Sequence, residues 1–168
     1  MRSFETPHPI AITVDLALGD LRVSAGDRAD TIVSVQPTDP SKPADVTAAN
    51  DARVEYADGR LTINAPKSWR RFSPFDHAGS VQVTIDVPTG SSLEASSSLG
   101  DLQVDGELDR CRVKAAMGNI RVDHCGPLTL KTGYGNVDVD HVEGDADINT
   151  GSGDVRIGTV VGLSLIHI

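Results

Sequence analysis

One five-residue pattern, G-[DN]-[LIV]-x-[VI], recurs through this chain of 168 residues. It is written GDLQV, GNIRV, GNVDV and GDVRI in the C-terminal half, and GDLRV near the N-terminus. The clustered copies begin at glycines spaced 18, 17 and 18 residues apart: Gly100, Gly118, Gly135 and Gly153. A unit this short cannot bury an apolar face alone, so the period predicts a stack of equivalent units.

Each repeat holds two short stretches in which apolar and polar residues alternate. The positions two and four residues after the repeat glycine are aliphatic: Leu102 and Val104, Ile120 and Val122, Val137 and Val139, Val155 and Ile157. A second row precedes the glycine by seven and five residues: Leu93 and Ala95, Cys111 and Val113, Leu128 and Leu130, Ala146 and Ile148. Such alternation is typical of strands with one buried face. The sequence therefore predicts an all-β fold, a β-solenoid (single-stranded β-helix) with about 17–18 residues per rung.

The repeat glycine and the Asp or Asn after it are expected at a turn of every rung. Glycine adopts backbone conformations that other residues disfavour, and short polar side chains hydrogen-bond to turns. We expect the polar residues to form a ladder along one edge. The predicted turn residues are Gly100, Asp101, Gly118, Asn119, Gly135, Asn136, Gly153 and Asp154.

The N-terminal half departs from the regular repeat. Residues 12–23 fit one isolated rung in the same register, and residues 30–90 interrupt the array. An open solenoid end exposes unpaired strands, so we interpret this segment as a β-rich cap. The expected organisation is one continuous domain, with the first rung and cap at 1–90 and solenoid repeats at 91–162. Within the cap we expect a strand at 31–35, a weak helix at 43–52, a hairpin around Asp58 and Gly59, and a strand at 81–87.

Composition limits the partners and the location. The formal net charge is −9, and a phosphate backbone is bound mainly by clustered Lys and Arg, so nucleic acid is not an expected partner. No apolar run reaches the length of a signal peptide or a membrane helix, which argues against membrane insertion and predicts a cytoplasmic location. In that compartment Cys111 and Cys125 are expected as core thiols rather than a disulfide.

The segment PKSWRRFSPF, residues 66–75, gathers aromatic and basic residues in an acidic chain. Arg and Trp are enriched where binding energy concentrates. The alternative is a loop whose aromatic side chains plug the solenoid end. The interaction candidates are Trp69, Arg70, Arg71, Phe72 and Phe75.

Columns of polar side chains offer a weaker case for chemistry. His124 and His141 occupy equivalent places in successive rungs, as do Asp123 and Asp140. Such columns could hold a divalent metal, and paired carboxylates could serve a glycosidase. Repetition alone produces both on any solenoid surface, and no nucleophile-elbow or phosphate-loop pattern is present. We therefore assign no catalytic residue, no metal site and no cofactor.

The motifs GDLQV, GNIRV, TGYGNVDV and TGSGDVRIG resemble those of a bacterial β-strand-repeat family of unknown function whose members are called adhesins. The likeness extends over residues 4–162. The chain resembles the actinobacterial members of the family in three segments, FETPHPIAITVDLALGDLRVSAGDR, DPSKPADV and RVEYADGRLTINAPKSWRRFSPF. This resemblance implies a β-solenoid with no established enzyme activity. The name adhesin there rests on repeat architecture, and this chain lacks the secretion signal that an adhesin needs.

The resemblance also implies a longer protein, with further rungs after residue 162. The chain ends instead in LSLIHI, residues 163–168, which the end of a common sequencing adapter encodes in one frame. We interpret this hexapeptide as an adapter-derived artefact closing a metagenomic fragment. The alternative is that Leu163, Leu165 and Ile166 begin a genuine strand.

These observations predict a non-enzymatic scaffold or interaction protein, adhesin-like, that binds an unknown protein or cell-surface component. A truncated solenoid leaves its last rung bare and can associate end to end with another copy. Two alternatives stay open. One is a carbohydrate-active β-helix enzyme that uses Asp123 and Asp140, and the other is a metal-binding repeat protein.

Overall fold

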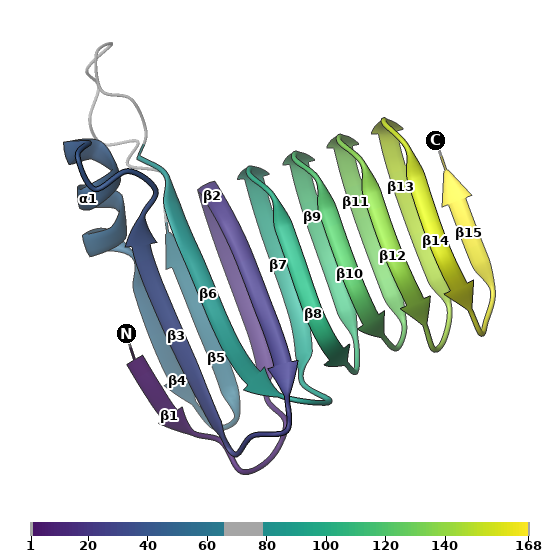
Figure 1. Cartoon of the computed structure of the whole chain (residues 1–168), viewed down its shortest axis with the longest axis horizontal. Helices are drawn as coiled ribbons and strands as arrows, with labels where there is room; N and C mark the ends of the chain where they lie inside the picture. The colour runs from purple at the N-terminus through teal and green to yellow at the C-terminus, as the bar shows by residue number, and fades with distance from the viewer. Residues whose placement is uncertain (1, 66–78, 168) are drawn as a thin grey trace.

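A computed structural model describes residues 2–65 and 79–167 (Figure 1). These described residues form fifteen strands and one helix. In chain order these are β1 (Arg2–Glu5), β2 (Ala11–Gly26), β3 (Asp30–Pro37), α1 (Pro43–Asp51), β4 (Arg53–Ala57), β5 (Arg60–Ala65), β6 (Val81–Pro88), β7 (Ser92–Leu99), β8 (Leu102–Leu108), β9 (Cys111–Met117), β10 (Ile120–Cys125), β11 (Leu128–Tyr134), β12 (Val137–Val142), β13 (Ala146–Ser152), β14 (Val155–Val160) and β15 (Ser164–His167).

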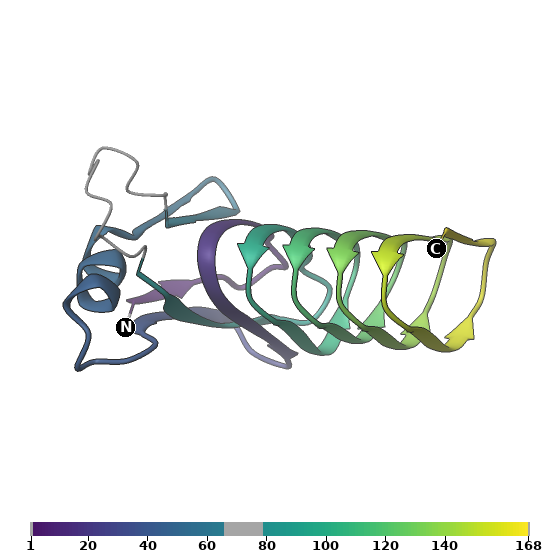
Figure 2. The same cartoon turned by 90° about the horizontal axis from the view of Figure 1, so that it is seen from above.

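The strands form two facing sheets that the chain winds between, rung after rung (Figure 2). Sheet A has the order β14-β12-β10-β8-β2-β6-β3-β1, and sheet B has the order β15-β13-β11-β9-β7-β2-β5-β4. The long strand β2 belongs to both, because its first half pairs with β7 and its second half with β8. The β-solenoid predicted from the repeat is confirmed.

Parallel strands stack in register, so equivalent repeat positions lie side by side. In sheet A, Ile120 pairs with Leu102 on one side and Val137 on the other. In sheet B, Leu128 lies between Cys111 and Ala146. These inward side chains are all at most 6% exposed, and together the rows make one continuous core. Burial of aliphatic side chains therefore holds neighbouring rungs together.

The N-terminal half contains a rung that the repeat pattern does not show. Strand β5 pairs in parallel with the first half of β2, and β6 pairs in parallel with its second half. Together β5 and β6 form a rung on the side of β2 that faces away from β7 and β8. Residues 66–80 are inserted between them where other rungs have a short turn. That insertion breaks the 17–18-residue spacing, which explains why residues 30–90 looked like an interruption of the array.

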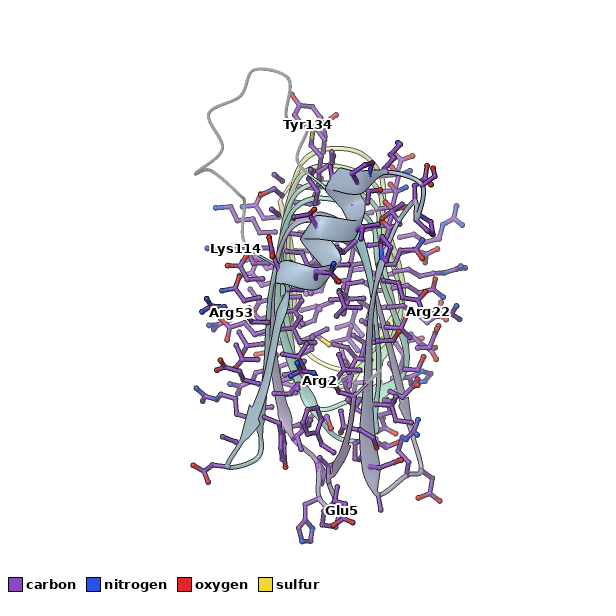
Figure 3. All side chains as sticks on the ribbon, turned by 90° about the vertical axis from the view of Figure 1, so that its left-hand side faces the viewer. Arg2, Glu5, Arg22, Arg53, Lys114 and Tyr134 are labelled. Atoms are coloured by element: carbon purple, nitrogen blue, oxygen red, sulfur yellow. The ribbon has the colours of Figure 1, made fainter. Side chains whose placement is uncertain are left out.

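Antiparallel strands and the helix close the N-terminal end. Strand β3 pairs with β6 and β1 with β3, while β4 forms a hairpin with β5. Helix α1 lies across the opening between the sheets (Figure 3), where Ala48, Ala49 and Ala52 pack against the core. Buried Asp45 anchors the helix by accepting hydrogen bonds from the backbone N–H groups of Asp39 and Ser80. No helix in residues 2–65 and 79–167 is long and apolar enough to cross a membrane.

The repeat glycines lie where the backbones of successive rungs come closest. Gly118 has φ +142°, and a Cβ atom there would overlap the carbonyl oxygen of Gly100. Gly135 has the same φ and stands in the same relation to Gly118. Any other residue would meet both an unfavourable backbone conformation and a collision with the preceding rung.

The Asp and Asn side chains after these glycines form a hydrogen-bonded ladder. The Oδ1 atom of Asp101 accepts from the backbone N–H of Asn119 at 2.9 Å, and Asn119 Oδ1 accepts from the N–H of Asn136 at 3.0 Å. Asn136 Oδ1 continues the ladder to the N–H of Asp154 at 3.0 Å. The ladder begins one rung earlier, where Asp20 Oδ1 accepts from the N–H of Asp101. Each rung therefore satisfies a turn donor of the next.

We predict that Gly118→Ala lowers the free energy of unfolding by about 1–3 kcal/mol, since alanine at this φ is strained before its collision is counted. Gly26→Ala is the matched control, because a Cβ atom there meets no atom within 4 Å. We expect the control to change stability by at most about 0.5 kcal/mol. Urea unfolding followed by circular dichroism measures both, and equal effects would contradict the close approach of the rungs.

Candidate functional site

The aromatic and basic candidates of residues 66–75 lie outside the described residues. Trp69, Arg70, Arg71, Phe72 and Phe75 therefore stay a prediction. The flanking residues do locate the segment along the chain. It follows Ala65, which pairs with Leu16, and precedes Val81, which pairs with Gly19. Strand β5 therefore ends, and strand β6 begins, at the edge where the repeat glycines lie.

The histidine and aspartate columns lie on the outer face of sheet A. The rings of His124 and His141 are tilted by 36° to one another with centroids 5.0 Å apart, and His141 Nε2 lies 3.4 Å from Glu143 Oε1. Asp123 Oδ1 lies 3.0 Å from His124 Nδ1, and its Oδ2 accepts a hydrogen bond from the Gly106 N–H at 3.2 Å. Within the described ranges, no three His, Cys, Asp or Glu side chains converge as a metal site would require.

Asp123 has the properties of a structural acceptor rather than of an acid catalyst. Partial burial acts to raise its pKa, but hydrogen bonds from the Gly106 N–H and from His124 outweigh burial and leave the pKa below its usual value. A glycosidase acid needs a raised pKa so that it carries a proton at neutral pH. The Asp123 geometry therefore gives no support to the enzymatic alternative.

The two cysteines share one rung and point into the core. Cys111 opens β9 and Cys125 closes β10, and they are 0% and 2% exposed. The hydrogen bond between the two thiols, together with burial, raises the pKa of Cys111 far above its usual value. A nucleophilic cysteine needs an accessible thiolate, so Cys111 is a core residue without catalytic character.

A shallow groove of about 490 Å³ runs along the outer face of sheet B near the turn edge. Its floor is made by small residues at one position of three successive rungs, Ala116, Gly133 and Gly151. The inward residues just before them are also small or short, including Ala115 and Thr132. Because side chains are small on both faces of these strands, the wall of the solenoid is thin here and its surface is hollowed. We call this feature the sheet B groove.

Two stacked lysines form one wall of the sheet B groove. Lys114 and Lys131 are register partners on adjacent parallel strands, and both are exposed. Ser96 precedes Lys114 in the same column, and Asn149 follows Lys131. Within residues 2–65 and 79–167, neither lysine lies within 4.0 Å of a carboxylate. The column therefore places two lysines, neither paired with a carboxylate of the described residues, on strands whose backbones are about 4.8 Å apart.

An apolar row stands beside the groove at the turn edge. Leu99, Met117 and Tyr134 are register partners, one residue before each repeat glycine, and they are 47%, 49% and 63% exposed. Figure 3 shows Tyr134 at the edge between the two sheets, with Lys114 pointing outward from sheet B and Arg22 outward from sheet A. The groove thus combines a cationic wall with a floor of small residues, and it lies beside an exposed apolar edge.

The inward repeat positions do not reveal the sheet B groove, but the exposed positions of the repeat contain a signal for it. The lysines stand four residues before Gly118 and Gly135, and the apolar row stands one residue before Gly100, Gly118 and Gly135. Equal offsets in successive repeats predict adjacency in a solenoid. The shared offset of Lys114 and Lys131 from their repeat glycines therefore predicts that the two lysines lie side by side.

The family profile of Toastrack DUF4097 matches residues 10–165. The chain belongs to this family. The resemblance to a bacterial β-strand-repeat family is thereby confirmed, while the actinobacterial type stays a prediction. No curated protein matches the sequence.

Several solved structures are similar to this chain at low sequence identity. A candidate cell adhesion protein from Clostridium sporogenes has a TM-score of 0.51 and 11% identity, over 93% of this chain and 97% of that chain. A candidate adhesin from Bacteroides fragilis has a TM-score of 0.36 and 12% identity, over 99% and 94% of the two chains. A candidate lipid-binding protein from Parabacteroides distasonis has a TM-score of 0.35 and 12% identity, over 96% and 95%. At 11% identity, the likeness to the Clostridium sporogenes protein shows the fold alone.

We predict that Lys131→Gln raises the free energy of unfolding by about 0.2–1 kcal/mol at low salt, because like charges in register destabilise a sheet. Added salt screens the repulsion, so the gain shrinks as ionic strength rises. The matched control is Arg121→Gln on sheet A, where the register partners are Gln103 and Asp138 and no repulsion is relieved. Urea unfolding at two salt concentrations compares them. A stability gain in the control, or none at Lys131, contradicts the lysine stack.

Proposed function

We propose that this protein is a non-catalytic, adhesin-like interaction module that binds a cell-surface component through the sheet B groove. The observation that carries the proposal is the coincidence of Lys114 and Lys131, a small-residue floor and an exposed apolar row along neighbouring rungs. A solenoid repeats its surface chemistry at every rung, which suits an elongated partner that makes the same contact several times. The family and the name of the Clostridium sporogenes structure support an adhesion role.

The described surfaces favour binding over catalysis. The carboxylate and imidazole groups on sheet A bond to one another and to the backbone, as Asp123 does with His124 and Gly106. The groove on sheet B is lined by lysine, serine, threonine, asparagine, alanine and glycine, which hold and orient a ligand. A surface partner requires that the chain reach the outside of the cell, whereas its sequence predicts a cytoplasmic location. Fractionation of the native host, with detection of the full gene product, decides between these locations.

The groove can be filled without disturbing the core. Ala116 is exposed on the groove floor, so Ala116→Trp places an indole in the groove. Gln82→Trp places the same side chain on the exposed face of β6 in sheet A and serves as the control. Neither substitution changes the net charge. The unfolding midpoints of both variants are measured first, and we expect both to stay close to that of the unmodified chain.

We expect fluorescently labelled protein to bind bacterial cell envelopes in a saturable way, and the groove-filled variant to lose most of this binding. The control variant should bind like the unmodified chain. Binding is measured by co-sedimentation and by depletion of fluorescence from the supernatant. An Ala116→Trp variant that folds and still binds envelopes normally would remove the groove from the proposed function, and an unmodified chain that binds no envelope would overturn the function itself.

A further inference from the structure

The chemistry of the sheet B groove points to an anionic ligand. Lys114 and Lys131 stack in register without a neutralising carboxylate among the described residues, although the whole chain has a formal net charge of −9. Placing like charges in register is destabilising unless an opposite charge bridges them. A ligand with negative groups spaced at about one strand separation would remove this repulsion and bind both lysines at once.

A peptide cannot bind in this groove by adding a strand to a free edge of the sheet. Strands β7, β9 and β11 are each paired on both sides, and β13 is paired with β11 and β15. The groove therefore offers no free backbone edge, and an added peptide strand would leave its own backbone groups unpaired. A ligand of this groove must instead bind through groups that reach the protein side chains. Ser96 and Asn149, at the two ends of the lysine column, provide neutral hydrogen-bonding groups for such a ligand.

The apolar row favours a ligand with flat, partly apolar faces. Tyr134 and Met117 stand exposed on neighbouring rungs at the edge beside the groove (Figure 3). The face of a pyranose ring carries C–H groups that pack against aromatic and thioether side chains, while its hydroxyl and carboxylate groups point sideways. Two lysines are too few for a nucleic acid, whose binding needs many phosphate contacts.

We propose that the sheet B groove binds an extended polysaccharide that carries carboxylate groups, with Lys114 and Lys131 pairing to carboxylates of successive sugar residues. This inference rests on the proposed function, because it names the ligand class of the same groove. The chain of sugars lies along the solenoid axis across β9 and β11, and Tyr134 packs against one sugar face. The rest of the protein surface is acidic, so it does not attract an anionic polysaccharide over long distances. Short-range ion pairs at the two lysines therefore determine which polysaccharide binds.

The test titrates the full chain with oligogalacturonate and with its methyl-esterified, uncharged form, by isothermal titration calorimetry. The double variant Lys114→Gln/Lys131→Gln removes both cations. Its control is Arg121→Gln/Arg156→Gln, which removes two exposed cations from sheet A and changes the net charge equally. We expect the acidic oligomer to bind the unmodified chain and the control alike, the lysine variant to bind it at least about tenfold more weakly, and the esterified form not to bind.

Polyglutamate distinguishes sugar recognition from attraction to any polyanion. The proposal expects polyglutamate to bind more weakly than oligogalacturonate, because it has no ring face for Tyr134. Equal affinity for the two polymers, equal weakening in the arginine control, or no binding of oligogalacturonate overturns the glycan assignment. If envelopes still bind in a manner that Ala116→Trp abolishes, the proposed function survives with another ligand, so failure of the inference and failure of the function are separable.

Discussion

The close approach of successive rung backbones at the turn edge is the constraint on which the rest of the structure depends. Gly100, Gly118 and Gly135 each lie against the carbonyl of the repeat glycine before them, in a conformation that favours glycine. This approach lets the Asp and Asn ladder connect one turn to the next. With the turns fixed, the strands on either side stack in register, and the inward aliphatic rows become one core.

The same in-register stacking creates the surface to which we assign function. A solenoid copies each exposed position along its length, so a lysine repeated at one offset becomes a cationic column. Small residues repeated on both faces of a strand become a groove, as Ala115 and Ala116 do together with Thr132 and Gly133.

Much of the fold could be predicted from the sequence because a stack makes its periodicity visible. The glycine spacing and the alternating rows placed the strands from Leu93 to Val160 on the correct faces. The rung formed by β5 and β6 could not be seen, since the insertion after Ala65 separates its two strands and removes the repeat glycine. The anchoring role of Asp45 was also hidden, because its partners at Asp39 and Ser80 are brought together only by the folded cap. The sheet B groove depends on which exposed residues lie side by side. The periodicity of the inward-facing apolar residues alone does not identify those neighbours.

The measurement that tests this account most directly is a pair of distances between spin labels on the outer face of sheet B. Thr13, Glu94, Arg112, Thr129 and Asp147 are successive register partners, and Thr62 pairs with Thr13 on the far side of β2. At about 4.8 Å per strand, labels at Thr13 and Asp147 should lie about 19 Å apart and labels at Thr62 and Asp147 about 24 Å apart. A Thr62–Asp147 distance equal to or shorter than the Thr13–Asp147 distance would contradict the stacked array, and with it the adjacency of Lys114 and Lys131.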